Sequence, residues 1–199
     1  HLPLSNEAVL EAQMLMLQAH NILNPANGAP ITVPAQDMVL GLYYITKLRK
    51  GAKGEGLTFY GPEEALIAYN EGKVDIHAII NVVAKDLDEN GNIVDKMIKE
   101  TSVGRVIVNE IVPAEVGYLN TIISKKSLRD IISDVIKAVG VARACEFLDG
   151  IKNLGYKMAF EGGLSFNLGD IIIPKEKEEL VKRGHEEIEQ IMMNYNMGF

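Results

Sequence analysis

The chain has 199 residues, of which 47% are hydrophobic and 24% are charged, and its formal net charge is −7. This is the composition of a globular protein with one or two modest cores, and it excludes disorder throughout. The longest apolar runs, 38–45 and 76–84, fall far short of the roughly 20 residues of a membrane-spanning helix, so we expect no membrane contact. The acidic balance also disfavours a free-standing nucleic-acid binder, which would cluster Lys and Arg against phosphates.

Local signals place the elements of the first third. Ser5 can cap a first helix, and Pro34 closes a short β-branched run. Asp37 can cap the next helix, and the basic, glycine-rich segment after it predicts a mobile loop. In chain order we expect a helix to about residue 20, a loop over 21–30, a strand over 31–33, a helix over 38–46, a mobile loop over 47–56, a strand over 57–60 and a helix over 62–72.

The rest of the chain predicts a β-hairpin followed by helices. Asn90-Gly91 between two alternating runs is a strong hairpin signal. In chain order we expect paired strands over 76–85 and 93–100, helices over 103–111, 127–139 and 141–160, an irregular connector over 164–173 and a charged helix over 175–196. The predicted fold class is α+β, mostly helical, with a small hairpin-containing sheet and a terminal half of a helical hairpin.

The half-hairpin is inferred from the last helix, which carries an apolar row on a charged background. The row recurs at alternating steps of three and four residues, as in a coiled-coil seam, and comprises Val181, Gly184, Ile188, Ile191 and Tyr195. A helix this charged is marginal alone and needs a partner along the row. We therefore expect Ile188, Ile191 and Tyr195 to be exposed, disordered or packed against another copy.

Motifs that resemble metal, phosphate or catalytic sites are better explained by structure. The run 86–93 matches the first eight positions of a calcium loop, but position twelve is Met97 where calcium needs a bidentate Glu, so a polar hairpin tip is expected. In the segment 51–56 the third glycine of a phosphate loop is missing and Glu55 would repel a phosphate. Cys145 is expected to be a buried structural thiol. The histidines lack zinc-ligand spacing and stand at His1, His20, His77 and His185.

The start of the chain, from His1 through Gly28 and over Ile31–Tyr44, contains some forty contiguous residues that follow the pattern of one family. They strongly resemble the largest subunit, β′, of bacterial RNA polymerase, and Thr101–Arg105 and Ile171–Lys175 extend the likeness over most of the chain. The resemblance implies three parts: the end of the active-site-bearing domain over 1–20, a pore domain over 21–168 and the start of the funnel or rim helices over 169–199.

The resemblance also implies what the whole enzyme does. In this family a loop whose three aspartates hold the catalytic magnesium comes just before the position of His1, so we expect no catalytic or metal-binding residue here and no activity from this piece alone. The whole enzyme is expected to be a cytoplasmic, nucleoid-associated nucleotidyltransferase, the DNA-directed RNA polymerase of transcription, with two metals at its active centre. The expected partners are the β, α, ω and σ subunits, the DNA template, RNA, nucleoside triphosphates and secondary-channel transcription factors.

In this family the pore borders the secondary channel, through which nucleotides enter and backtracked RNA leaves. Pro25, Asn27, Gly28 and Gln36 correspond to family positions close to the active centre. For Gln36, a polar contact to nucleotide or RNA and a structural role as an amide that caps the following helix are weighted equally.

The final helix resembles the first half of the rim hairpin at the funnel mouth. Glu178, Lys182 and Glu186 are candidates for factor docking there, against the simpler interpretation of a solvated helix face. An alternative function for the whole chain is a stand-alone acidic protein-interaction module that binds a partner through the helix beginning at Lys175.

Overall fold

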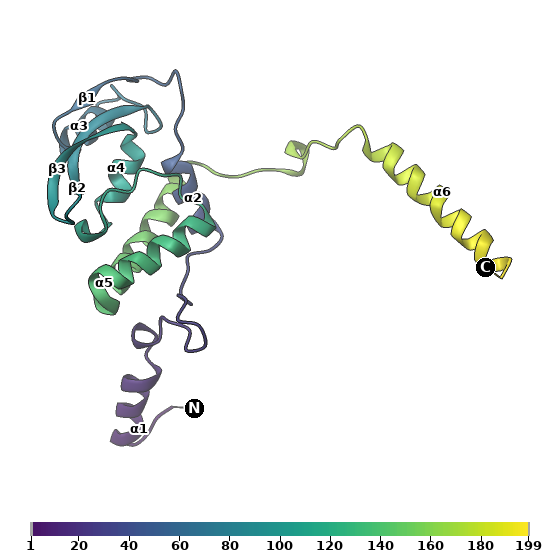
Figure 1. The fold of residues 1–199 in the computed structure, drawn as a ribbon, viewed down its shortest axis with the longest axis horizontal. Coiled ribbons are helices and arrows are strands. Elements are labelled where there is room, and N and C mark those ends of the chain that lie inside the picture. Colours follow the sequence, from purple (N-terminus) through teal and green to yellow (C-terminus); the bar gives the residue numbers. More distant parts are fainter. Residues whose placement is uncertain (1, 199) are drawn as a thin grey trace. The chain divides into compact units, whose positions relative to one another are not determined.

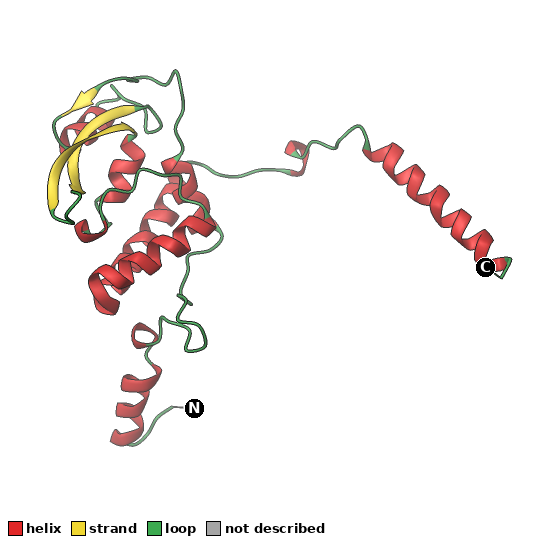
Figure 2. Cartoon of the chain, viewed as in Figure 1, coloured by secondary structure: helices red, strands yellow, loops and turns green. Residues whose placement is uncertain are grey.

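The structure, a computed structural model, describes residues 2–198, so the predictions made for His1 lie outside it. The predicted α+β class is confirmed, because the described residues form six α-helices and a mixed sheet of three strands (Figure 2). The chain divides at Leu164 into two compact units, which are described separately.

Figure 1 labels the helices and strands and colours the chain from purple at the N-terminus to yellow at the C-terminus. In chain order the helices are α1 (Asn6–Glu11), α2 (Asp37–Thr46), α3 (Pro62–Asn70), α4 (Val103–Asn109), α5 (Lys125–Glu161) and α6 (Lys177–Asn196), and the strands are β1 (Thr58–Phe59), β2 (Ile80–Leu87) and β3 (Ile93–Thr101).

The predicted strand pairing and turn of the hairpin are confirmed, although its first strand begins at Ile80 and not at residue 76. β2 and β3 pair antiparallel, with Lys85 opposite Asp95, and β1 adds to the other edge of β2 in parallel. At the tip, Asp88 Oδ1 accepts hydrogen bonds from the backbone amides of Asn90 and Asn92, both at 2.8 Å. The hydrogen bonds from Asn92 lower the pKa of the Asp88 carboxyl. The calcium-like run is thus a polar hairpin tip in which Asp88, its second aspartate, stabilises the turn.

The two helices expected on either side of Gly140 are also confirmed, as the two halves of α5. Gly140 interrupts helical geometry with φ +78°, a conformation that glycine adopts at little cost. Ser124 caps the first half: its Oγ accepts from the Ser127 amide at 3.2 Å, while Ser127 Oγ accepts from the Ser124 amide at 2.7 Å.

The first predicted helix is wrong in length. After α1 the chain forms a turn of π-helix over Ala12–Met16, is extended at Leu17 and forms a 3-10 turn over Gln18–His20. The side-chain Nδ2 of Asn21 donates to the carbonyls of Leu15 at 2.8 Å and Leu17 at 3.0 Å. Side-chain donors that bind carbonyls in this way compete with the regular helix, and α1 has no buried residue to oppose them.

The predicted strand over 31–33 is likewise not formed. The structure has a single antiparallel bridge between Leu23 and Pro30, continued by one hydrogen bond from the Ile31 amide to the Ile22 carbonyl at 2.8 Å. Pro30 and Pro34 flank the segment and carry no amide hydrogen, so a regular ladder cannot extend across it.

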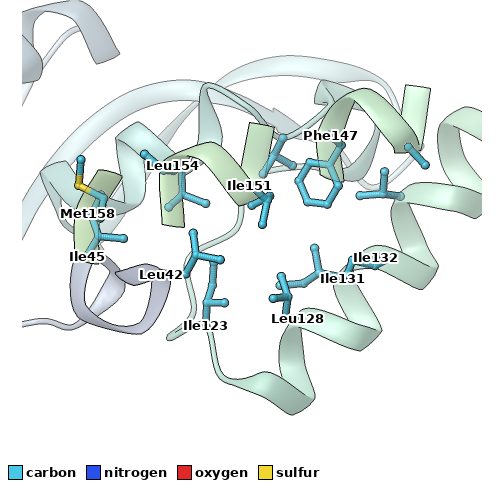
Figure 3. Close-up of a cluster of buried hydrophobic side chains, with 14 of the residues drawn as sticks. Leu42, Ile45, Ile123, Leu128, Ile131, Ile132, Phe147, Ile151, Leu154 and Met158 are labelled. Atoms are coloured by element: carbon cyan, nitrogen blue, oxygen red, sulfur yellow. The ribbon is translucent and has the colours of Figure 1, made fainter. Parts of the chain in front are cut away.

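Two hydrophobic cores organise the first unit. The larger core lies between α2, Ile123 and both halves of α5 (Figure 3). Its fully buried members include Leu42, Ile45, Ile123, Leu128, Ile132 and Ile151. The smaller core fills the space between the sheet and helices α3 and α4, and it includes Phe59, Ala65, Ile80, Val82, Val103 and Val106. The first core places α2 against the start of α5, where the candidate site lies.

The second unit consists of a connector with a 3-10 turn at Leu168–Asp170 and the helix α6. The predicted exposure of its apolar row is confirmed, with Ile188 at 58%, Ile191 at 66% and Tyr195 at 74% of full exposure. Within residues 2–198, no helix combines the length and apolarity needed to cross a membrane.

Candidate functional site

Gln36 has an unusual backbone conformation at the start of α2. Its φ is +51° and its ψ is −124°, a region that residues other than glycine adopt at a cost of about 1–3 kcal/mol. The Gln36 side chain is exposed and makes no capping hydrogen bond to α2. The conformation therefore orients an amide outward, and the alternative that Gln36 caps the helix through its side chain is wrong.

Gln36 borders a shallow groove of about 380 Å³ between α2 and the start of α5. The apolar wall comes from α2, and the opposite rim holds the cap residue Ser124 and the exposed ammonium group of Lys125. The lining residues are Gln36, Val39, Leu40, Tyr43, Ser124 and Lys125. The groove thus combines an amide, a cation and partly exposed apolar side chains.

Sequence reasoning missed Lys125 and Tyr43 as neighbours of Gln36. Tyr43 follows Gln36 by seven residues, which on a helix is two turns along the same face. That spacing was available as a signal, whereas nothing in the sequence indicates that Lys125, 89 positions later, meets this face. Only the packing of α5 on α2 brings the two segments together.

The loop containing Pro25, Asn27 and Gly28 is compact and exposed. The Asn24 amide donates to the Ala29 carbonyl at 2.9 Å, and the Gly28 amide donates to the Asn24 carbonyl at 2.7 Å. Asn27 Oδ1 accepts from the Ala29 amide at 3.0 Å, so this side chain is used within the loop. Gly28 has φ +67°. The loop does not line the groove, so the structure does not bring it together with Gln36.

A buried polar network fixes the two sides of the groove. Arg105 on α4 is 5% exposed, and its Nε donates to the Thr46 carbonyl at the end of α2 at 3.0 Å. Its Nη1 donates to the carbonyl and side-chain oxygens of Asn120 at 3.0 and 2.8 Å. Thr46 Oγ1 in turn accepts from the Ile123 amide at 3.0 Å. These bonds hold the chain entering α5 against the end of α2.

The charge state of this network follows from its burial. Burial lowers the pKa of the Arg105 guanidinium, and its three hydrogen bonds go to neutral oxygen acceptors of Thr46 and Asn120 instead of a carboxylate. Close by, Tyr118 Oη shares a 3.0 Å hydrogen bond with Thr101 Oγ1. Burial raises the pKa of Tyr118 to about 12. The Arg105 side chain therefore serves the fold, because it is buried and its donors bind oxygen atoms of the chain itself.

The polar groups that line the groove are the Gln36 amide, the hydroxyls of Tyr43 and Ser124 and the Lys125 ammonium group, and its lining includes no carboxylate, histidine or thiol. Within residues 2–198, His, Cys, Asp and Glu side chains form no group able to hold a metal ion. Cys145 is half-buried, and its Sγ lies 3.7 Å from the Ala19 carbonyl, so it is less enclosed than expected.

The candidate docking residues of the second unit lie on α6. Glu178, Lys182 and Glu186 are all exposed, and Lys182 Nζ lies 3.8 Å from Glu186 Oε1, one helical turn away. Such surface pairs contribute little to stability, so these three side chains are available to a partner.

Comparison with known proteins identifies the family. The family described as RNA polymerase Rpb1, domain 3, matches residues 21–171. Among curated proteins, the DNA-directed RNA polymerase subunit beta′ of Phocaeicola vulgatus is 94% identical over 199 residues, and that of Bacteroides fragilis is 87% identical. The corresponding subunit of Flavobacterium johnsoniae is 54% identical over 203 residues. Each alignment covers 100% of this chain and 14% of the relative.

The predicted resemblance is confirmed along the whole chain, including α6, which lies beyond the matched family segment. The chain therefore belongs to the RNA polymerase Rpb1 domain 3 family and spans about 14% of the length of the bacterial β′ subunits it matches.

Proposed function

We propose that this chain forms a wall of the secondary channel in a DNA-directed RNA polymerase, where nucleoside triphosphates enter and backtracked RNA leaves. The observation that carries the proposal is the strained, outward-facing amide of Gln36 beside Lys125. Backbone strain at an exposed residue without a structural partner is typical of functional positions. An amide and an ammonium group that line the same groove suit a ligand that presents both hydroxyl or base edges and phosphate oxygens.

The proposed domain organisation assigns residues 1–20 to the end of the active-site-bearing domain, 21–168 to the pore and 169–199 to the start of the funnel or rim. The division of the structure at Leu164 lies close to the second of these boundaries, which supports the proposal. In the rim segment, Glu178, Lys182 and Glu186 are proposed to contact transcription factors that enter the channel.

In the whole enzyme, magnesium is proposed to be held by aspartates outside this chain, since the described residues offer no suitable cluster. No step through the metal is therefore assigned to these residues. Their proposed contribution is to position and admit the substrate. The isolated chain should consequently be inactive, and template-dependent RNA synthesis by it would overturn this part of the proposal.

A reconstituted polymerase carrying Gln36→Ala in its β′ subunit tests the role of the groove. If Gln36 contacts the nucleotide with one hydrogen bond, the KM for nucleoside triphosphates should rise about fivefold, since such a bond contributes roughly 1 kcal/mol. The matched control is Gln190→Ala, which removes an exposed amide from α6. Unchanged KM and unchanged cleavage of backtracked RNA in Gln36→Ala would contradict the contact.

The alternative of a stand-alone acidic interaction module depends on α6 alone. Identity of 94% to a β′ subunit extends across all 199 residues, and this favours the polymerase. A module that used only α6 would not require the sequence of residues 1–164 to match a polymerase subunit.

A further inference from the structure

The loop between α2 and β1 carries a positive charge that the rest of the chain does not share. Residues 47–56 contain four cations and one carboxylate, whereas the chain as a whole has a net charge of −7. The cations are Lys47, Arg49, Lys50 and Lys53, and all four side chains are exposed.

These cations are not neutralised by neighbouring acids. Within residues 2–198, none of the four takes part in an ion pair. The nearby carboxylates bind backbone amides instead: Glu55 Oε2 accepts from the Gly51 amide at 2.5 Å, and Asp75 Oδ1 accepts from the His77 amide at 2.8 Å. Glu55, which the sequence predicted to repel a phosphate, keeps its negative charge in this turn, and the four cations leave the loop 47–56 with a net charge of +3 (four minus one).

The loop backbone is also fastened to the body of the unit. The Arg49 amide donates to the His77 carbonyl at 2.9 Å, the Lys53 carbonyl accepts from the Asp75 amide at 2.9 Å, and the Gly56 amide donates to the Ile79 carbonyl at 2.7 Å. His77 Nδ1 lies 3.0 Å from the Lys47 carbonyl. The predicted loop is therefore an anchored series of turns, so presenting its cations requires little further ordering of the backbone.

An exposed aromatic residue lies along the same edge. Arg49 pairs with Ala78 and Phe59 pairs with Val82, both in the parallel sense, so Tyr60 comes one residue beyond this ladder. Tyr60 is 85% exposed. Continuing the pairing by one residue places Tyr60 opposite Val83, five steps along the chain from Ala78. At about 3.3 Å per residue, Arg49 and Tyr60 are therefore roughly 16 Å apart along the edge.

We infer that the loop 47–56, together with Tyr60, is a binding surface for single-stranded nucleic acid. Unpaired cations contact successive phosphates, and an exposed aromatic ring provides a platform on which a base stacks; sites for single strands begin at about four nucleotides. An acidic peptide would use the cations but would gain nothing from the stacking ring. The inference rests on the proposed channel function, because it assigns a surface that would contact the RNA strand in the channel. Its test measures binding and needs no polymerase activity.

The test is an NMR titration of the ¹⁵N-labelled 199-residue chain with a single-stranded oligouridylate RNA, with inorganic triphosphate and with polyglutamate in separate arms. RNA should shift the amides of the loop 47–56 and Tyr60. It should also bind at least tenfold more tightly than triphosphate or a polyglutamate of equal charge. Equal affinity for polyglutamate would overturn the inference in favour of an acidic protein partner, and equal affinity for triphosphate would overturn the role of a strand.

The charge variant is Arg49→Gln/Lys50→Gln/Lys53→Gln, which changes exposed side chains while leaving the backbone anchors in place. Loss of three phosphate contacts should reduce the salt slope of binding by about 2, from roughly 0.7 per contact on single strands. The control Lys137→Gln/Lys152→Gln/Lys157→Gln removes equal charge from lysines that lie in ion pairs on α5. An equal loss in the control would show that net charge, not this loop, governs binding.

The aromatic variants separate stacking from charge. Tyr60→Ala should weaken RNA binding about fivefold or more, because stacking contributes roughly 1–3 kcal/mol per base, and Tyr60→Phe should retain it. RNA affinity that is unchanged in Tyr60→Ala would remove Tyr60 from the surface and overturn the stacking part of the inference.

Discussion

The backbone of Gly41 on α2 lies directly against the backbone of Gly155 on α5. A Cβ atom built on Gly41 would overlap the Gly155 carbonyl oxygen and would lie 2.8 Å from the Ala159 nitrogen. A Cβ atom on Gly155 would in turn lie 2.6 Å from the Met38 carbonyl oxygen. The two glycines let the helices approach closely, which also closes the larger core and sets the width of the groove beside Gln36.

Gly41→Ala should destabilise the first unit by about 1–3 kcal/mol, because the added methyl group can be accommodated only by moving one helix backbone away from the other. The free energy of unfolding from urea denaturation measures the effect. Gly184→Ala on α6 is the matched control, since a Cβ there meets no atom within 4 Å. If both variants unfold at the same urea concentration as the parent, the close approach of α2 and α5 at Gly41 does not require glycine.

Arg105→Met should destabilise the first unit by roughly 2–4 kcal/mol. The methionine keeps the apolar stem but leaves the buried carbonyls of Thr46 and Asn120 without their charged donor. Thermal unfolding followed by circular dichroism provides the measurement. Arg143→Met removes a guanidinium that pairs with Glu115 at the surface and should cost less than about 1 kcal/mol. A similar loss in both variants would contradict the role assigned to the buried network.

Tyr118 should make stability fall at high pH. Its folded-state pKa is raised to about 12 by burial, above an unfolded value near 10, so the folded state holds the phenolic proton more tightly. The resulting stability is fully present below about pH 10 and is lost as the pH rises towards 12, by roughly 3 kcal/mol for a shift of this size.

The variant Tyr118→Phe removes the titrating hydroxyl, and its unfolding free energy should therefore vary less between pH 9.5 and 12 than that of the parent. Urea denaturation at several pH values in this window measures the difference. Tyr195→Phe, on the separate helix α6, provides the control. Parallel curves for Tyr118→Phe and the parent would refute the assignment.

Gln36→Gly should separate stability from function. Glycine adopts positive φ without the penalty that other residues incur, so the variant should be about 1 kcal/mol more stable than Gln36→Ala. In a reconstituted polymerase both variants should show the same rise in nucleotide KM, because both lack the amide. Equal stability of the two variants would indicate that the backbone at position 36 is not strained.

The elements with strong local signals were predicted well. Asn90-Gly91 defines a hairpin whatever surrounds it, and Gly140 separates two helices because it takes a conformation that breaks the helix. The prediction was wrong at 12–20 and 31–33, where apolar periodicity favoured regular elements. At 12–20 the Asn21 side chain binds two backbone carbonyls and competes with the regular helix. At 31–33 the flanking prolines at 30 and 34 lack the amide hydrogens that a regular strand pairing needs.

The sequence by itself determined the family, the α+β class and the order of the elements, because these follow from local propensity and from some forty contiguous matching residues. It also indicated Gln36, but not its strained backbone or its groove. Only the tertiary structure brought Lys125 into the same groove as Gln36 and left the cations of the loop 47–56 without an ion-pair partner among the described residues. Contacts between segments far apart in the chain arise from how α2 packs on α5 and from which acids the backbone amides bind, and neither leaves a periodic trace in the sequence.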